Sequence, residues 1–365
     1  MRLEAHRMGR RPRGTYLAPC PLLEIRHLSI SYSLSSEILR AVRDISVQVY
    51  EGETLALAGE TGSGKSTIAL AVLGLLDPQA QVESGEISYE GCSLQSLKKL
   101  DWKEIRGRKI GIIFQDARSA LNPVLTIEDH LIETLRAHQP LIKKEAQARA
   151  SDLLQEVGIP KGHEKLYPFE LSGGICQRVG IALAICNNPR LLIADEPTSS
   201  LDSTIQAQIL DLLLLMKQRH GLALLLISHD LALISQVADR VSVMYHGRIV
   251  ESGLKEEVFA FPAHPYTQSL IQCLIGLQHH HETHPLMPIP GVVPIPGQDF
   301  PGCVFAPRCG NSKPECQRMI PVEREVSSSH WVACTHDFGD KEWEPGKWAE
   351  RSKGVKGKRG KGEEG

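Results

Sequence analysis

The chain of 365 residues is 42% hydrophobic, and its 41 Lys and Arg are nearly balanced by 43 Asp and Glu, which gives a formal net charge of −2. This length predicts one principal domain and a smaller appended module. The balanced charge argues against a general nucleic-acid binder, so no nucleic-acid partner is expected. The longest apolar run, residues 68–76, is too short to cross a bilayer, and we expect any membrane role to come through a partner.

The amino-terminal part is predicted to form a leader followed by an antiparallel lobe. Residues 1–20 are rich in Arg and contain Pro without an apolar period, which predicts a disordered leader. No apolar segment and cleavage site of a signal peptide follow the basic residues. Apolar and polar residues alternate at 45–50, and more weakly at 23–32, which predicts half-buried strands.

Short continuous apolar runs farther along the chain predict a parallel sheet that is covered on both faces. Helical patterns at 143–157 and 205–217 are predicted to be the crossovers that parallel strands require. The predicted fold class is therefore α/β. The strands of this sheet are expected at 54–58, 110–114, 191–194, 224–227 and 241–245.

The sequence GETGSGKST stands between an apolar strand and a helical run and matches the phosphate-binding pattern G-x-x-x-x-G-K-[ST]. Its glycines let the backbone direct N–H groups at phosphate oxygens, and the dipole of the following helix adds to this attraction. Lys65 is predicted to neutralise the β and γ phosphates, Ser66 to ligate Mg²⁺ and Thr67 to reach the α phosphate. The alternative is a glycine-rich turn without a ligand. The predicted ATP-binding residues here are Gly59, Glu60, Thr61, Gly62, Ser63, Gly64, Lys65, Ser66 and Thr67.

Two adjacent carboxylates, Asp195 and Glu196, follow the apolar strand in RLLIADEP. Burying them is costly unless they meet a cation or a reacting water. Asp195 is predicted to lie in the outer shell of Mg²⁺. Glu196 is predicted to be the general base that polarises the water attacking the γ phosphate. Acidic residues at the end of a strand can instead cap a helix, which is the alternative interpretation.

The sequence LSGGICQR at 171–178 resembles the signature motif of the ATP-binding-cassette family. Ser172, Gly173 and Gly174 precede a predicted helix, so a hydroxyl, bare backbone and a helix N-terminus form a second anion site. The resemblance implies a head-to-tail dimer, in which this motif closes on ATP held by the opposite subunit. The usual Gln at the end of the motif is Ile175 here.

The other marks of the family follow in the expected order. The resemblance implies that Gln115 in IIFQD senses Mg²⁺ and water, that Asp202 in SSLD belongs to the loop beside ATP, and that His229 in LLISHD hydrogen-bonds the γ phosphate. Gln115 and His229 then join Glu196 as catalytic residues, and Gln115 joins Ser66 and Asp195 around Mg²⁺. Tyr32 stands where the family places an aromatic residue against adenine, although core packing is equally compatible with this position.

The resemblance extends to one branch of the family. The sequences QDARSALNP, HPYTQSL and PGCVFAPRC, at 115–123, 264–270 and 301–309, are similar to those of dipeptide, oligopeptide and nickel importers. It implies an ATP-hydrolysing subunit that energises import of dipeptides or oligopeptides, with nickel or another small solute as the alternative. It also implies a peripheral location on the cytoplasmic face of the plasma membrane, with two permeases, a second ATPase subunit and an extracytoplasmic binding protein as partners. The loop 116–126 is the expected permease contact.

The resemblance implies a cassette ATPase domain at 21–258, with a RecA-like core, the antiparallel lobe and a helical subdomain at about 116–185. A carboxy-terminal extension is expected at 259–340, in which a Pro-rich stretch suggests a linker. The tail, 341–365, is basic, rich in glycine and predicted to be disordered. The histidine run at 279–284 is expected to be polar linker, with nickel or zinc binding as the alternative.

Four cysteines of the extension are spaced as C-x5-C-x6-C-x17-C in a module with little core of its own, which suggests metal ligands. Structural zinc sites usually have closer pairs, and the family resemblance favours a [4Fe-4S] cluster. Zinc and unliganded thiols remain open. The predicted ligands are Cys303, Cys309, Cys316 and Cys334.

A soluble cassette ATPase that acts on ribosomes or DNA is the rival from another functional class. Relatives of that kind carry two cassettes or a long coiled-coil insertion, whereas one cassette with a short insertion is present here. An exporter ATPase is a third alternative, and the Cys-containing extension argues against it. These distinctions depend on resemblance, and the sequence does not name the solute.

Overall fold

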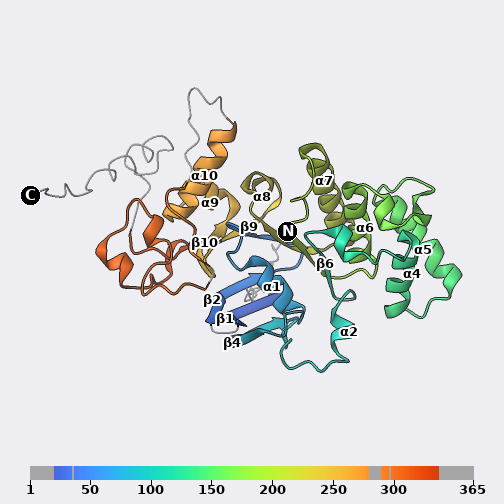
Figure 1. The fold of residues 1–365 in the computed structure, drawn as a ribbon, viewed down its shortest axis with the longest axis horizontal. Coiled ribbons are helices and arrows are strands. Elements are labelled where there is room, and N and C mark those ends of the chain that lie inside the picture. Colours follow the sequence, from blue (N-terminus) through green and yellow to red (C-terminus); the bar gives the residue numbers. More distant parts are fainter. Residues whose placement is uncertain (1–19, 35–36, 279–288, 296, 337–365) are drawn as a thin grey trace, which may run out of the picture.

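The computed structural model describes residues 20–34, 37–278, 289–295 and 297–336 (Figure 1). The predicted disordered tail and the histidine run lie outside the described residues, as does the predicted leader apart from its last residue. In the described part of the chain, no helix combines the length and the apolar character needed to cross a membrane.

The larger sheet has eight strands in the order β11-β12-β10-β9-β3-β8-β7-β6. The strands from β9 to β6 are parallel to one another and are buried almost throughout, as expected of a sheet with helices on both faces. This confirms the α/β class. The bounds of these five strands are Thr54–Ala58 (β3), Ile110–Ile113 (β6), Leu191–Asp195 (β7), Ala223–Ser228 (β8) and Arg240–Tyr245 (β9).

The antiparallel lobe is a second sheet of four strands in the order β2-β1-β4-β5. Its strands are Leu23–Leu34 (β1), Glu37–Val49 (β2), Ala80–Tyr89 (β4) and Cys92–Ser93 (β5). The alternation predicted at 45–50 is confirmed, because Ile45, Val47 and Val49 are buried in a core shared with β3 and α1 (Lys65–Val72), while the polar residues between them face outward.

The helical subdomain consists of α3 (Ala117–Ala120), α4 (Ile127–His138), α5 (Lys143–Glu156) and α6 (Gly173–Ile185). The helix predicted at 143–157 as part of a crossover is α5, and it does lie in the connection between the parallel strands β6 and β7. It packs on α4 and α6, whereas α6 makes the contact with β6, because the chain between β6 and β7 forms a subdomain of its own. Two 3₁₀ turns, His163–Lys165 and Pro168–Glu170, precede α6.

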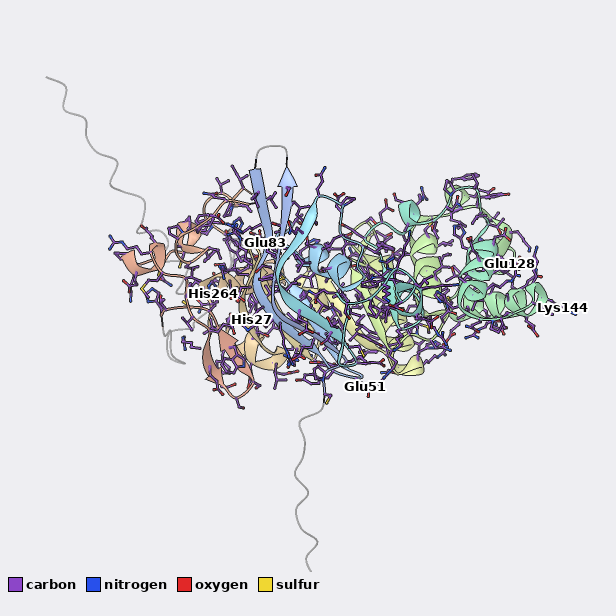
Figure 2. All side chains as sticks on the ribbon, turned by 90° about the horizontal axis from the view of Figure 1, so that it is seen from below. His27, Glu51, Glu83, Glu128, Lys144 and His264 are labelled. Atoms are coloured by element: carbon purple, nitrogen blue, oxygen red, sulfur yellow. The ribbon has the colours of Figure 1, made fainter. Side chains whose placement is uncertain are left out.

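The remaining helices of the cassette are α2 (Trp102–Ile105), α7 (Ser203–His220) and α8 (Leu231–Val237). The predicted crossover at 205–217 lies within α7 and is confirmed. The helices α4 to α6 and the extension lie at opposite ends of an elongated molecule (Figure 1). Seen from below, Lys144 marks one end, His264 lies toward the other, and Glu83 of the lobe stands between them (Figure 2).

The extension continues directly from the cassette sheet. Its predicted start at residue 259 lies within α9 (Lys255–Ala260). After α9 it contains α10 (Pro265–Gln278), β11 (Arg324–Ser327), β12 (His330–Val332) and two 3₁₀ turns, Ala306–Arg308 and Pro314–Gln317. The strand β12 pairs antiparallel with β10 (Arg248–Leu254), so β11 and β12 belong to the eight-stranded sheet. A buried pair, His330 Nε2 and Glu251 Oε1 at 2.7 Å, reinforces this junction.

Candidate functional site

At two positions of the loop between β3 and α1, the backbone conformation and the close neighbours allow only glycine. Gly59 has φ 146° and Gly64 has φ 101°, both outside the range that side chains favour. A Cβ atom at Gly59 would lie 2.2 Å from the Met244 carbonyl oxygen, and one at Gly64 would lie 2.3 Å from that of Ala41. The loop therefore packs directly on two neighbouring backbone segments, and α1 begins immediately after it.

The ammonium of Lys65 lies inside this loop. Its Nζ donates to the carbonyl oxygens of Gly59 at 2.7 Å and Glu60 at 2.9 Å, and to Ser63 Oγ at 3.3 Å. Burial lowers the pKa of Lys65, while the nearby carboxylates, with Glu196 foremost, act in the opposite direction. The lysine is thus a buried cation next to the acidic residues at the end of β7.

Ser66 and Asp195 meet at the start of α1. Ser66 Oγ donates to Asp195 Oδ1 at 3.0 Å. Burial raises the pKa of Asp195, Glu196 raises it further, and Ser66 and Lys65 oppose the shift. A divalent cation here would offset the cost of burying this carboxylate. Hydroxyl and carboxylate oxygens are the donors that Mg²⁺ prefers, so these residues fit the predicted Mg²⁺ site.

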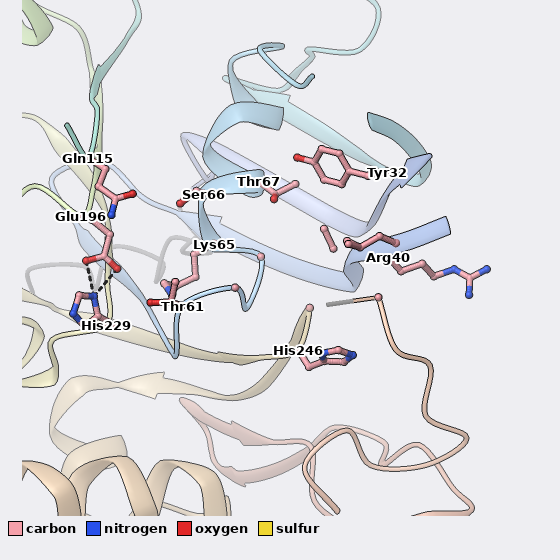
Figure 3. Close-up of a pocket in the computed structure, with 16 residues that line it drawn as sticks. Tyr32, Arg40, Thr61, Lys65, Ser66, Thr67, Gln115, Glu196, His229 and His246 are labelled. Atoms are coloured by element: carbon pink, nitrogen blue, oxygen red, sulfur yellow. Dashed lines mark hydrogen bonds and ion pairs between the residues drawn. The ribbon is translucent and has the colours of Figure 1, made fainter. Parts of the chain in front are cut away.

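Glu196 and His229 form a close pair. His229 Nδ1 lies 2.8 Å from both Glu196 Oε1 and Oε2, as the dashed lines in Figure 3 show. Glu196 has φ 47°, a left-handed conformation, and its N–H donates to the Ile227 carbonyl oxygen at 2.9 Å. Strained backbone of this kind is often found at functional sites. The histidine comes from the end of β8, so two adjacent strands bring the pair together.

A cleft of about 390 Å³ lies between the phosphate loop, the lobe and the ends of β7 and β8 (Figure 3). Gln115 reaches it from the end of β6, opposite Tyr32, which is half-buried on β1. Of the residues predicted from the sequence, the structure places these around the cleft: Tyr32, Thr61, Gly62, Gly64, Lys65, Ser66, Thr67, Gln115, Glu196 and His229.

Six other residues of the cleft lining were not predicted: Leu39, Arg40, Ala41, His246, Gly247 and Gly297. Arg40 belongs to β2, His246 to the turn after β9 and Gly297 to the extension. Their sequence surroundings match no phosphate or nucleotide pattern, so no local signal marks them. They reach the cleft only because the lobe and the extension fold against the cassette.

The signature residues lie away from this cleft. Ser172 caps α6, and its Oγ accepts from the Ile175 N–H at 3.4 Å, with Gly173 and Gly174 in the first turn. Asp202 caps α7, accepting from the Ile205 N–H at 3.0 Å. None of these four predicted nucleotide-binding residues lines the cleft of the same chain.

The four cysteines of the extension are free thiols, and each is buried or half-buried. Burial raises the pKa of Cys309 to about 12, with smaller contributions from Cys303, Cys334 and Cys316. Cys316 Sγ also lies 3.2 Å from His336 Nε2. Within the described residues, however, no group of three or more His, Cys, Asp or Glu is placed to hold a metal ion. The structure therefore gives no support to the predicted [4Fe-4S] cluster or to zinc.

Comparison with known proteins agrees with this geometry. The family model for the ABC transporter matches residues 42–199, and that for the oligopeptide/dipeptide transporter C-terminal region matches residues 250–316. Among solved structures, a dimeric ATP-binding cassette in a post-hydrolysis state, bound to ADP and Pi, is similar to this chain with a TM-score of 0.58. The two are 26% identical, and the match covers 64% of this chain and 98% of the other.

Curated relatives cover more of the chain. The dipeptide transport ATP-binding protein of Bacillus subtilis is 42% identical, over 86% of this chain and 94% of its own length. The dipeptide transport ATP-binding protein of Escherichia coli is 40% identical, over 87% of this chain and 98% of its own length. The oligopeptide transport ATP-binding protein of Mycobacterium tuberculosis is 44% identical over 86% of this chain, which spans only 52% of that relative. The chain therefore belongs to the ATP-binding proteins of the ABC transporter family, in the group that includes the oligopeptide and dipeptide transport ATP-binding proteins.

Proposed function

We propose that this chain binds Mg-ATP in the cleft and hydrolyses it to energise an ABC importer for dipeptides or oligopeptides. The proposal that ATP is hydrolysed rests on the Glu196–His229 pair, which faces the cleft beside Lys65 and Ser66. The names of the relatives support dipeptides as the transported solute, because the B. subtilis and E. coli proteins are named dipeptide transport ATP-binding proteins and match almost over their full lengths.

The site residues divide the chemistry among them. The loop N–H groups and Lys65 bind the β and γ phosphates and stabilise the charge that develops during transfer. Ser66, Gln115 and Asp195 would hold Mg²⁺, which neutralises phosphate charge. Glu196 accepts a proton from the attacking water, and His229 orients its carboxylate and hydrogen-bonds the γ phosphate. Tyr32 supplies a flat ring for adenine on the opposite wall.

We propose that ATP hydrolysis requires a second ATPase subunit, either identical or related. Ser172 and Gly173 are exposed at the N-terminus of α6, where backbone N–H groups can receive a phosphate anion. Because these residues do not line the cleft of their own chain, they are available to the nucleotide of the opposite subunit. The dimeric cassette that resembles this chain supports such an arrangement.

We place the permease contact on the helical subdomain. Val124 in the predicted contact loop is 75% exposed, and Phe169 is 67% exposed. Phe169 stacks on Tyr167 with ring centroids 5.6 Å apart, and the Ile127 N–H donates to the Leu166 carbonyl oxygen at 3.1 Å, which joins the loop to the stacked pair. Exposed apolar side chains grouped in this way favour a protein partner. Two permeases would place the chain on the cytoplasmic face of the plasma membrane, and an extracytoplasmic binding protein would deliver the solute.

Capture of the assembled system tests this proposal. Tagged Glu196→Gln protein, incubated with ATP and Mg²⁺, is expected to retain two polytopic permeases and a second cassette ATPase from gently solubilised native membranes. Mass spectrometry identifies the companions, and the same capture without nucleotide is the control. Recovery of ribosomal or DNA-repair proteins without permeases would show that the cassette serves a different function.

We further propose that the thiols of Cys303, Cys309, Cys316 and Cys334 bind a metal when it is supplied, with a [4Fe-4S] cluster first and zinc second. What supports this is the spacing C-x5-C-x6-C-x17-C in a small module with little core of its own. Anaerobic purification is expected to yield about four iron and four sulfide per chain, and Cys316→Ser should lower both. A colourless protein without iron or zinc would contradict the proposal.

A further inference from the structure

The extension reaches the phosphate loop through one arginine. Arg308 ends the 3₁₀ turn Ala306–Arg308 and is only 6% exposed. Its Nη1 donates to Glu60 Oε2 at 2.7 Å, and its Nη2 donates to Glu60 Oε1 at 3.1 Å. Glu60 is the second residue of the phosphate loop. Such a two-pronged contact restricts both position and orientation of the carboxylate.

The extension also holds the backbone of Glu60. The Glu60 N–H donates to Tyr266 Oη at 2.9 Å, and Tyr266 lies on α10. The Tyr266 ring packs against Tyr245, with centroids 4.6 Å apart, and Phe305 packs against both. Arg308 Nη1 donates to Tyr245 Oη at 3.2 Å as well. Both the side chain and the backbone of one loop residue therefore depend on the extension.

A second contact ties the extension to the wall of the cleft. Asp299 accepts from Arg43 Nη1 at 2.5 Å and from Arg40 Nη1 at 2.8 Å. Arg40 lines the cleft together with Gly297. Gln298 stands between Gly297 and Asp299 in the chain, and its carbonyl oxygen lies 2.7 Å from His246 Nε2. His246 also lines the cleft.

The charges explain why the arginine matters at this position. Glu60 is an acidic residue within the loop that is to receive a polyphosphate, and its carbonyl oxygen accepts from Lys65 Nζ at 2.9 Å. A carboxylate left free there would repel the phosphates and could turn toward Lys65. Burial alone would lower the pKa of Arg308, but its hydrogen bonds to Glu60 and Tyr245 outweigh that effect and raise it, so the guanidinium remains charged.

We propose that Arg308 is a positioning residue for ATP binding, which acts through Glu60 to hold the phosphate loop in the conformation that receives the triphosphate. The extension is then a part of the nucleotide site as well as an appended module. This inference rests on the proposed function insofar as the cleft is taken to bind Mg-ATP.

The test compares ATP binding by the full-length wild type with Arg308→Gln, Arg308→Lys, Glu60→Gln and the double variant Glu60→Gln/Arg308→Gln. We expect Arg308→Gln to raise the Kd for Mg-ATP about tenfold, which corresponds to about 1.4 kcal/mol. Glu60→Gln should raise the Kd less, because the amide loses the two-pronged contact but carries no charge that repels the phosphates. Arg308→Lys keeps the charge and should lie in between. The double variant should bind no more weakly than the worse single variant, because the two side chains act as one unit. In steady-state assays, KM should rise more than kcat falls.

Glu257→Gln is the matched control. Glu257 on α9 accepts from Ser327 Oγ at 3.0 Å and Ser329 Oγ at 2.8 Å, so the same chemical change loosens another contact of the extension without touching the phosphate loop. Its Kd for Mg-ATP should stay within about twofold of the wild type. Melting temperatures without nucleotide show how far each variant alters the fold alone.

The proposal is wrong if Arg308→Gln and Glu60→Gln bind Mg-ATP like the wild type, or if Glu257→Gln weakens binding as much as they do. A lower melting temperature with an unchanged Kd would reduce Arg308 to a structural role. If Arg308→Gln does not fold, Arg308→Lys and Glu60→Gln carry the same comparison. A wild-type chain that does not bind Mg-ATP would instead overturn the proposed function.

Discussion

Replacement of Glu196 by Gln is expected to slow ATP turnover by about 10²- to 10⁴-fold while ATP binding is retained, because the amide cannot accept the proton of the attacking water. The neutral side chain also removes a negative charge near the γ phosphate, so the ATP-bound dimer should persist. Phosphate release measured at saturating Mg-ATP gives the turnover, and size-exclusion chromatography with ATP reports the dimer.

A matched control for this variant is Glu128→Gln. Glu128 is a buried carboxylate of the helical subdomain, where it accepts from Gln147 Nε2 at 3.0 Å and pairs with Lys165, away from the cleft. The same substitution there should leave turnover of the isolated ATPase close to the wild-type value. Turnover by Glu196→Gln at the wild-type rate would refute its assignment as the general base.

The second large effect is expected at Lys65, where substitution by Ala should raise the Kd for Mg-ATP about 100-fold, or by about 2.7 kcal/mol. The ammonium is the buried cation of the phosphate loop, and it holds the loop through the carbonyl oxygens of Gly59 and Glu60. Its loss removes charge compensation for the phosphates and a contact that shapes the loop. Isothermal titration calorimetry of the Glu196→Gln background, which does not consume the ligand, measures the change.

Lys217→Ala is the control for Lys65→Ala. Lys217 Nζ donates to Thr54 Oγ1 at 2.6 Å and to Asp239 Oδ2 at 3.2 Å, so this lysine ties α7 to the start of β3, away from the phosphate loop. Its loss should lower the melting temperature but leave the Kd for Mg-ATP nearly unchanged. Equal binding by Lys65→Ala and the wild type would contradict the assigned role of Lys65.

The cassette could be predicted from the sequence because its signals are local. The phosphate loop follows β3, the two acids stand at the end of β7, and the histidine follows β8. Each of these strands is a buried apolar run, and neighbouring parallel strands end at the same edge of the sheet. Glu196 and His229 could therefore be expected to meet. The strands predicted at 54–58 and 191–194 agree with β3 and β7 to within one residue, because burial on both faces leaves an unbroken apolar run in the sequence.

Long-range contacts could not be predicted in this way. The packing partners of α5 are an example, since a crossover helix packed on other helices has the same apolar period as one packed on a sheet. The contact of Arg308 with Glu60 joins two chain segments with no local pattern in common. Arg308 lies in PGCVFAPRC, where the cysteines suggest metal ligands and nothing marks the arginine as a contact of the phosphate loop. Pairs of this kind become visible only when the extension is seen folded on the cassette.

The pairing of β12 with β10 affects how the protein is made. About 80 residues separate Glu251 from its partner Val332, so this contact forms late and at high contact order. During synthesis the ribosome releases β10 before β12. Until β12 pairs with it, β10 has unpaired backbone groups along one edge, and the carboxylate of Glu251 lacks its partner His330. Open strand edges promote association between chains. Nascent or truncated forms that end before residue 330 should consequently depend on chaperones far more than the complete chain does.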